Sequence, residues 1–144
     1  MNDRRADDDF QTAFWAAKRA MADASEAAFG RHGVRAGQQY ILLTLWDEDC
    51  LPPGEVARRL GLATPTVTRA ATRMDAAGLL RRQPHPTDRR LVRLCLTPRG
   101  RSLQRAIDAE MRSLTDRALA SLTTPERADL VRYLEEMQRN LSKP

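Results

Sequence analysis

The stretch VARRLGLATPTVTRAATRMDAAGLL, residues 56–80, decides the fold. Its first apolar residues recur at helical spacing up to Gly61, a residue type that commonly ends a helix. A second run with helical spacing, residues 64–77, ends before Gly78. Two short helices joined by a Gly-Leu-Ala turn are typical of a helix-turn-helix, whose second helix enters the major groove of DNA.

The second of these helices carries side chains that suit groove recognition. Val67, Ala71 and Met74 fall on one face and are expected to pack inward. The other faces carry hydroxyl and guanidinium groups, at Thr66, Thr68, Arg69, Thr72 and Arg73. Arginine can bond guanine through two parallel donors, and threonine can contact a phosphate or a thymine methyl. Threonine is a poor helix former, so helix propensity does not explain its abundance here.

After Gly78 the apolar period changes from helical spacing to two, which predicts a β-hairpin. Residues 80–83 are expected to form one strand, residues 84–90 a loop, and residues 92–96 a second strand with Arg93 and Cys95 on the face opposite the apolar one. A lone hairpin is marginally stable in water, so its apolar face is expected to lie on the helices. The arginines at its tip would suit the negative potential of a narrow minor groove.

The flanks of this core are helical in pattern. A first helix of about twenty residues is expected to end near Gly30, and a short second helix to run from about Gly37 to the acidic residues 47–49. Acids at the negative end of a helix dipole require either a solvated loop or a cationic neighbour. Three Thr-Pro steps mark further helix starts, with the threonine as the expected cap, at Thr64, Thr97 and Thr124.

Positive charge is concentrated in the middle of the chain. The protein has 144 residues and a net charge of +5, but eleven arginines and only two acids lie between Arg58 and Arg101. This distribution is typical of a protein that binds the phosphate backbone of nucleic acids. A solvated charged face is the alternative, but it does not explain why the excess is confined to one stretch and uses arginine alone.

Other functional classes find little support. No apolar run is long enough to span a membrane, and we expect a single cytoplasmic domain. Cys50 and Cys95 stand apart without metal-ligand spacing, so we expect reduced thiols, no disulfide framework and no metal or cofactor. The two histidines, His32 and His85, lie in no recognisable catalytic motif, and we expect no enzymatic activity.

The run VARRLGLATPTVTRAATRMDAAGLLRRQPHPTDRRLVRLCLTPRG, residues 56–100, resembles the winged helix-turn-helix core of MarR-type transcriptional regulators. The matching pieces are TVTR, the Gly78-Leu79 step, Asp88-Arg89-Arg90, and Leu96-Thr97 followed by Gly100. The resemblance implies a mainly α fold with a small β-hairpin wing, in one domain over residues 1–144. Within it, residues 37–97 would form the DNA-binding lobe, and the first and last two helices, residues 8–30 and 98–142, a dimerisation region.

The resemblance also assigns roles to individual residues. Arg90 corresponds to the wing-tip arginine of the family, Asp88 to the acid that orients it, and Arg89 to a phosphate contact; Arg81 or Arg82 would pin the DNA backbone. The expected DNA contacts are Thr64, Pro65, Thr66, Thr68, Arg69, Arg73, Arg82, Arg89 and Arg90. Apolar stripes in the last two helices would serve the dimer, at Leu103, Ile107, Leu114, Ala118, Leu130, Leu134, Met137 and Leu141.

The implied function is that of a homodimeric repressor that binds a palindromic operator on double-stranded DNA and is released by a small aromatic or phenolic effector. Candidate effector contacts are Trp15, His32, Tyr40 and Leu43, although core packing or solvent contact also explains these residues. Two alternatives remain: a sequence-tolerant architectural DNA-binding protein, and a thiol-based oxidation sensor that uses Cys50 or Cys95. The family's peroxide sensors carry a reactive cysteine in the first helix, which has none here.

Overall fold

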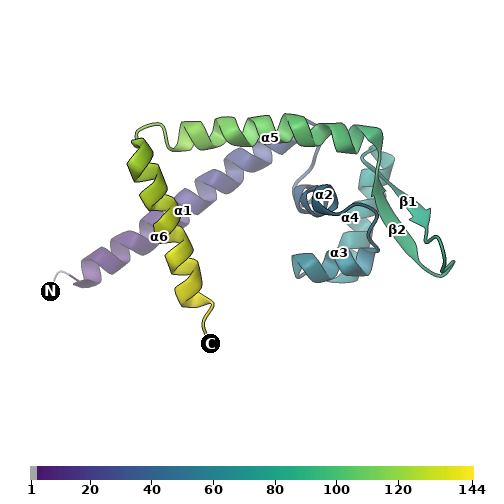
Figure 1. Ribbon diagram of the computed structural model, residues 1–144, viewed down its shortest axis with the longest axis horizontal. Coiled ribbons are helices and arrows are strands. Elements are labelled where there is room, and N and C mark those ends of the chain that lie inside the picture. The colour runs from purple at the N-terminus through teal and green to yellow at the C-terminus, as the bar shows by residue number, and fades with distance from the viewer. Residues whose placement is uncertain (1–2) are drawn as a thin grey trace. The chain divides into compact units, whose positions relative to one another are not determined.

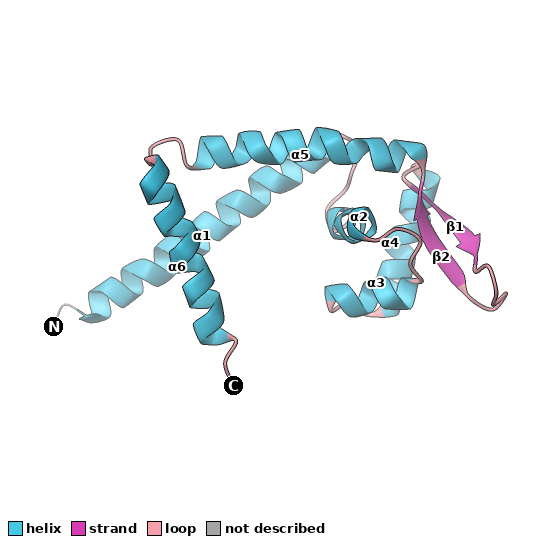
Figure 2. Ribbon diagram, in the orientation of Figure 1, coloured by secondary structure: helices cyan, strands magenta, loops and turns pink. Residues whose placement is uncertain are grey.

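The computed structural model describes residues 3–144, which form six helices and a two-stranded sheet (Figures 1 and 2). The chain divides into two compact units, of which the first ends at Met111 and the second spans Arg112–Pro144. In chain order the elements are α1 (Asp3–Gly30), α2 (Gln38–Asp47), α3 (Pro53–Leu60), α4 (Thr64–Ala76), β1 (Leu80–Pro84), β2 (Val92–Leu96), α5 (Pro98–Ala118) and α6 (Thr124–Leu141).

The helix-turn-helix is confirmed as α3 and α4. Gly61 and Gly78 end these helices with φ values of 65° and 76°, in the left-handed region that glycine adopts without strain. The first amide after each glycine turns back to close the helix end: Leu62 N donates to Ala57 O at 2.9 Å, and Leu79 N donates to Met74 O at 2.9 Å. Both boundaries therefore follow from the position of a glycine.

The buried face of α4 is the one predicted from its spacing. Val67, Ala71 and Met74 are each 0% exposed, and they pack in one cluster with the buried residues of α2 and β2. Burial of one face fixes the rotation of α4 about its axis, so its remaining faces point to solvent. The main members of this cluster are Ile41, Leu42, Leu45, Leu51, Val56, Leu79, Leu80, Leu94 and Ile107.

Two expectations about helix ends need correction. Of the three expected threonine caps only Thr97 is right: its Oγ1 accepts from Gly100 N at 3.0 Å. Thr64 and Thr124 are instead the first helical residues, and Thr123 closes a capping box before α6. The first helix is also longer than predicted, with 28 residues, because its polar N-terminal segment continues the helix beyond the apolar pattern.

The strands β1 and β2 pair antiparallel, from Leu80 opposite Leu96 to Pro84 opposite Val92. The predicted alternation in β2 holds at Leu94 and Leu96, which are buried, but fails at Val92 and Cys95. Val92 is 43% exposed because it lies beside the turn, where the hairpin extends away from the helices. Cys95 is 2% exposed, and the α2–α3 loop lies along the free edge of β2 through a β-bridge between Leu51 and Leu94, which places Cys50 directly beside Cys95.

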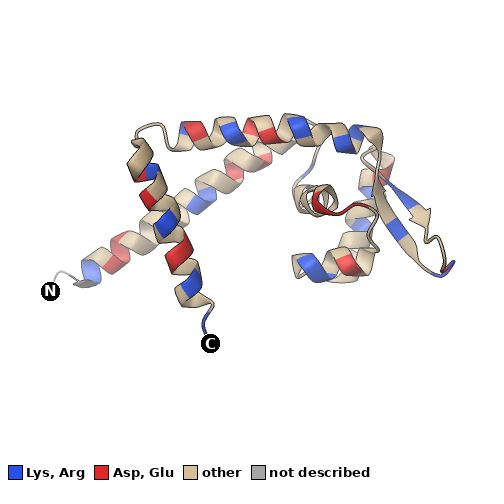
Figure 3. Ribbon diagram, in the orientation of Figure 1, with Lys and Arg blue, Asp and Glu red and all other residues tan. Residues whose placement is uncertain are grey.

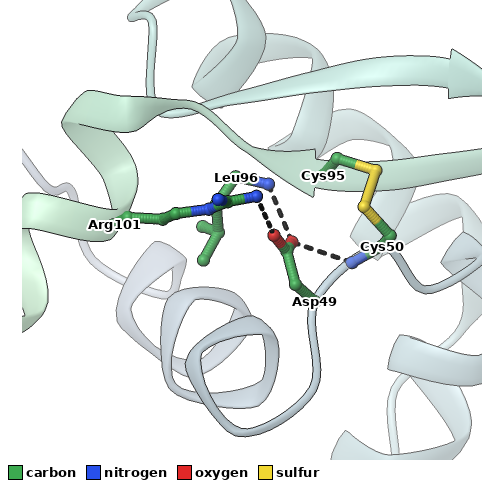
Figure 4. Close-up of a disulfide and its surroundings, with 5 residues drawn as sticks. All are labelled: Asp49, Cys50, Cys95, Leu96 and Arg101. Atoms are coloured by element: carbon green, nitrogen blue, oxygen red, sulfur yellow. Dashed lines mark hydrogen bonds and ion pairs between the residues drawn. A yellow bond between two sulfur atoms is a disulfide. The ribbon is translucent and has the colours of Figure 1, made fainter.

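The expectation of reduced thiols is also wrong, because Cys50 and Cys95 form a disulfide (Figure 4). The residues are 45 positions apart in sequence, and their Cα atoms lie 4.1 Å apart. Cys50 follows α2 and has a φ of 58°. This is the left-handed backbone conformation, which residues other than Gly and Asn rarely adopt. The bond therefore links the α2–α3 loop to the second strand of the hairpin.

The acidic residues that follow α2 have cationic neighbours, which settles the alternative left open by the sequence. Glu48 pairs with Arg59 of α3, and Asp49 Oδ2 lies 2.9 Å from Arg101 Nη2 of α5. These ion pairs offset the unfavourable position of the acids at the negative end of α2. Within residues 3–144, no helix is both long and apolar enough to cross a membrane.

Candidate nucleic-acid interface

The solvent-facing surface of α4 carries every residue predicted to read DNA from this helix. These side chains are all exposed: Thr64, Pro65, Thr66, Thr68, Arg69 and Arg73. The Oγ1 of Thr68 donates to Thr64 O, and that of Thr72 donates to Thr68 O, each at 3.0 Å. Each hydroxyl hydrogen is thus held by the backbone, which leaves oxygen lone pairs able to accept from a base amino group.

The arginines of β1 are tied to the end of α4 by a residue that the sequence did not single out. Arg81 Nη1 donates to the Asp75 backbone oxygen at 2.6 Å and to its Oδ1 at 3.1 Å. Arg82 N donates to Asp75 Oδ2 at 3.3 Å, and the Arg82 guanidinium lies 3.8 Å from the same oxygen. Asp75 therefore fixes the angle at which the hairpin leaves α4.

The tip of the hairpin is organised around Asp88. Its Oδ1 accepts from Arg90 N and Nε, both at 3.1 Å, and its Oδ2 accepts from Arg90 Nη2 at 3.2 Å. These bonds hold the pKa of the Asp88 carboxyl below its ordinary value. The Arg90 side chain remains 90% exposed, so most of its donors face solvent. Arg89 is exposed beside it.

His85 shapes the same loop, although its sequence context predicts no role for it. Its Nδ1 accepts from the backbone amides of Thr87 at 3.3 Å and Asp88 at 3.2 Å, which requires that this nitrogen carry no proton. Its own amide donates to Leu91 O at 3.0 Å across the loop. In the sequence, this role of His85 is indicated only by the spacing of His, Thr and Asp around Pro86, which is typical of a turn capped by a side chain.

The base of the hairpin is fixed by the segment that leads into α5. Thr97 Oγ1 donates to Gly78 O at 2.6 Å, and Trp46 Nε1 donates to Gly100 O at 2.9 Å. A side chain at Gly100 would overlap the carbonyl oxygen of Leu79, so only glycine allows the backbones to approach this closely. These contacts hold β1, β2 and the start of α5 together.

Positive side chains occur on α3, α4 and the hairpin, including its tip (Figure 3). The two arginines of α3 are engaged with Glu55, whose carboxylate accepts from Arg58 Nη2 at 2.6 Å and from Arg59 Nε at 3.0 Å. Hydrogen bonds from Arg58 and then Arg59 lower the pKa of Glu55 to about 2. Arg58 and Arg59 are thus ion-paired at the surface, as Arg90 is with Asp88 at the wing tip.

The four candidate effector contacts lie in different local settings. Trp15 Nε1 donates to Gln11 Oε1 at 2.8 Å on the exposed side of α1, and His32 Nε2 lies 3.1 Å from Glu110 Oε1. Tyr40 and Leu43 are 53% and 48% exposed on α2. The open cavity of about 750 Å³ beside the end of α1 has a different lining: Asp23, Glu26, Ala27, Gly30, Gly33, Val34, Arg35 and Ala36.

Comparison with known proteins identifies the family. A model of the MarR family matches residues 36–92, which include the helix-turn-helix and most of the hairpin. The HTH-type transcriptional regulator MT0903.1 of Mycobacterium tuberculosis is 31% identical over 104 residues, which are 72% of each chain. The chain belongs to the MarR family.

Further relatives extend the MarR match over more of the chain. The HTH-type transcriptional regulator TtmR of Methylorubrum extorquens is 31% identical over 129 residues, which cover 90% of this chain and 65% of TtmR. The crystal structure of RV1404 from Mycobacterium tuberculosis superposes with a TM-score of 0.81 at 26% identity and covers 94% of each chain. The mainly α fold with a β-hairpin wing is therefore the fold of MarR proteins. Within residues 3–144, no group of three or more His, Cys, Asp or Glu residues is placed to hold a metal ion.

Proposed function

We propose that this MarR protein is a sequence-specific DNA-binding transcriptional regulator, in which α4 enters the major groove and the hairpin tip reaches the neighbouring minor groove. The observation that carries the proposal is the division of α4 into two faces. One face is fully buried, and the other presents Thr66, Arg69 and Arg73 to solvent. A helix held in this way offers base-reading groups on a rigid support.

The experiment measures binding by fluorescence anisotropy to a labelled duplex that carries the intergenic sequence beside the gene. If a dimer neutralises about eight phosphates, the logarithm of affinity falls with the logarithm of salt concentration at a slope of roughly −7. Arg82→Ala is expected to reduce the steepness of that slope by about 2, because Arg82 contacts phosphate. Arg69→Ala is expected to cost about 1–3 kcal/mol at one base pair and to relax preference there.

Arg105→Ala supplies a matched control, because Arg105 is exposed on α5 and has the same charge, but lies outside the proposed interface. It is expected to leave both the affinity and its dependence on sequence unchanged. Uniform weakening by Arg69→Ala at every operator position would contradict its role as a base reader. Equal losses for Arg105→Ala and Arg82→Ala would indicate that only net charge matters.

The proposal includes a homodimer that represses transcription from an imperfect palindrome. Exposed apolar side chains on α1 and on α6 support it: Phe10, Trp15, Met21, Val131, Tyr133, Leu134 and Leu141. Two-fold symmetry then places the half-site centres about 10 bp apart. Light scattering is expected to give twice the chain mass, and Leu134→Glu, which places a charge among the exposed apolar side chains of α6, is expected to reduce that mass to one chain.

A small aromatic or phenolic effector that releases the operator is part of the same proposal, with Trp15, His32, Tyr40 and Leu43 as its candidate contacts. Such a molecule needs to favour one lobe spacing by only a few kcal/mol to change operator occupancy. The probe is 4-hydroxybenzoate, added to the protein–operator complex. Release that Tyr40→Ala abolishes supports the effector site, and unchanged occupancy at saturating probe counts against a simple phenol as effector.

Sequence-tolerant coating of DNA is the alternative that uses the same arginines. Competition separates the two functions, because a specific regulator prefers its site over bulk DNA by about a thousandfold or more. The hydroxyl-rich surface of α4 favours the specific regulator, since phosphate neutralisation alone has no need of it. Either function requires access to the chromosome, so we propose a cytoplasmic location. We also propose no enzymatic role, because His32 and His85 lie in no recognisable catalytic motif.

A further inference from the structure

The Cys50–Cys95 disulfide (Figure 4) lies where two hydrogen bonds also join the α2–α3 loop to the hairpin. Leu94 N donates to Leu51 O at 2.8 Å in the isolated β-bridge. Asp49 Oδ1 accepts from Leu96 N at 2.8 Å, so the residues on both sides of Cys95 are bonded to the residues on both sides of Cys50.

Asp49 also determines the position of Cys50 itself. Its Oδ1 accepts from Cys50 N at 2.8 Å, and its Oδ2 is held by Arg101 Nη2 at 2.9 Å. None of these contacts involves sulfur, so they hold the two cysteines side by side whether or not the thiols are oxidised. Two groups held in this way react with each other far faster than with a group on another molecule.

The two cysteine residues differ in their exposure to solvent. Cys50 is half-buried at the surface of the loop, whereas Cys95 is 2% exposed beneath it. An oxidant that arrives from solvent therefore meets Cys50 first. Cys95 is shielded from the oxidant but adjacent to whatever forms on Cys50. This is the arrangement required of a reactive cysteine and its resolving partner.

We propose that Cys50 and Cys95 form a redox-active pair that reduces hydroperoxides and, once oxidised, stabilises the DNA-binding lobe through an intrachain disulfide. The thiolate of Cys50 attacks the terminal oxygen of the hydroperoxide, the O–O bond breaks, and the products are a sulfenic acid and an alcohol. The Cys95 thiol then attacks the Cys50 sulfur, the S–O bond breaks, and water leaves with the Cys95 proton. Two thiols and one hydroperoxide thus give one disulfide, one alcohol and one water.

The disulfide closes a loop of the chain that contains α3, α4 and β1. This loop includes the helix-turn-helix and the tip of the hairpin. The disulfide leaves the exposed side chains of α4 and the wing tip untouched. Oxidation therefore restrains the hairpin against local opening without covering the DNA-binding surface. In this respect the pair differs from a switch that releases DNA, and this part of the inference rests on the proposed function.

The chemical test uses reduced protein treated with a substoichiometric amount of cumene hydroperoxide. Intact mass is expected to fall by two hydrogen atoms per chain, and non-reducing electrophoresis is expected to show single chains. In Cys95→Ala, dimedone is expected to trap a sulfenic acid on Cys50, while Cys50→Ser is expected to lose reactivity by at least about tenfold. In the wild-type protein, where Cys95 resolves the sulfenic acid, non-reducing peptide mapping is expected to give the Cys50–Cys95 disulfide peptide and no dimedone adduct. Chain-to-chain disulfides, or a dimedone adduct on Cys95, would overturn the assignment.

The stability test compares oxidised with reduced wild-type protein. The melting temperature is expected to rise by roughly 10 °C on oxidation, and this rise is expected to vanish in Cys50→Ser. Hydrogen exchange at the amides of Leu94 and Leu96 is expected to slow, because both donate into the joined region. Unchanged melting and exchange would refute the stabilising role.

The DNA test uses the duplex from the gene's intergenic region in both redox states. We expect oxidised protein to bind at least as tightly as reduced protein, and release on oxidation would overturn the stabilising role. If neither state binds DNA while the mass and exchange results hold, the proposed function fails and the redox pair stands.

Discussion

The Oγ1 of Thr97 donates a 2.6 Å hydrogen bond to the carbonyl oxygen of Gly78, across the base of the hairpin. Thr97 Oγ1 also accepts from Gly100 N at 3.0 Å. One hydroxyl therefore caps α5 and provides a donor for the carbonyl oxygen at the turn after α4. A residue outside the proposed DNA-binding surface thereby sets where the hairpin begins.

Thr97→Val keeps the shape of this side chain but removes the hydroxyl. The carbonyl of Gly78 and the amide of Gly100 would each lose a partner, so we expect the free energy of unfolding to fall by about 1–2 kcal/mol. Urea denaturation followed by circular dichroism measures the change. Thr97→Ser retains the hydroxyl and is expected to recover most of the loss; equal losses in both variants would assign the effect to packing instead.

Gly100→Ala tests the close approach between α5 and the turn before β1. The added methyl would overlap the carbonyl oxygen of Leu79, so the backbones must separate, at a cost of about 1–3 kcal/mol. Gly54→Ala is the matched control, because a Cβ at Gly54 in α3 meets no atom within 4 Å. Alanine there is expected to be neutral or stabilising. Similar melting temperatures for the two variants would contradict the steric argument.

Asp88→Asn tests how the wing tip is held. The amide oxygen of Asn can replace Oδ1, but its NH2 group cannot accept from Arg90 Nη2 as Oδ2 does, so Arg90 becomes less ordered before binding. We expect affinity for the operator duplex to fall roughly threefold to tenfold, with little change in melting temperature. The double variant with Arg90→Ala is expected to be no weaker than Arg90→Ala alone. Additive losses would mean that Asp88 acts independently of Arg90.

The lowered pKa of Glu55 predicts that the stability of the protein falls at acidic pH. Its pKa falls from 4.5 to about 2 because Arg58 and Arg59 bond the ionised form. A carboxyl whose pKa is lowered on folding contributes stability that is complete above its unfolded pKa and is lost as pH falls through its folded pKa. Thermal unfolding of Glu55→Gln is therefore expected to vary less with pH between 4.5 and 2 than that of the wild-type protein.

How far the sequence predicts this structure depends on how local each signal is. The ends of α3 and α4 follow from Gly61 and Gly78, because a left-handed residue is needed at those positions and glycine provides it. The inward face of α4 follows from the spacing of Val67, Ala71 and Met74. Each of these features is encoded within a few residues of where it appears.

The features that escaped prediction depend on residues that are distant in sequence. Cys50 and Cys95 are separated by 45 positions, and only the β-bridge of the α2–α3 loop brings them together. The burial of Cys95 was missed for the same reason, since strand alternation within β2 carries no information about a distant loop that pairs with its edge. Asp49 and Asp75 act through partners on other elements, such as Arg101 and Arg81, which spacing alone does not reveal.

The helix α6 contains no buried residue. A helix of 18 residues is only marginally stable alone in water, so most of its helicity must come from association. If a second copy provides that association, the C-terminal segment unravels on dilution and becomes open to proteases. The cellular abundance of the protein would then set its lifetime.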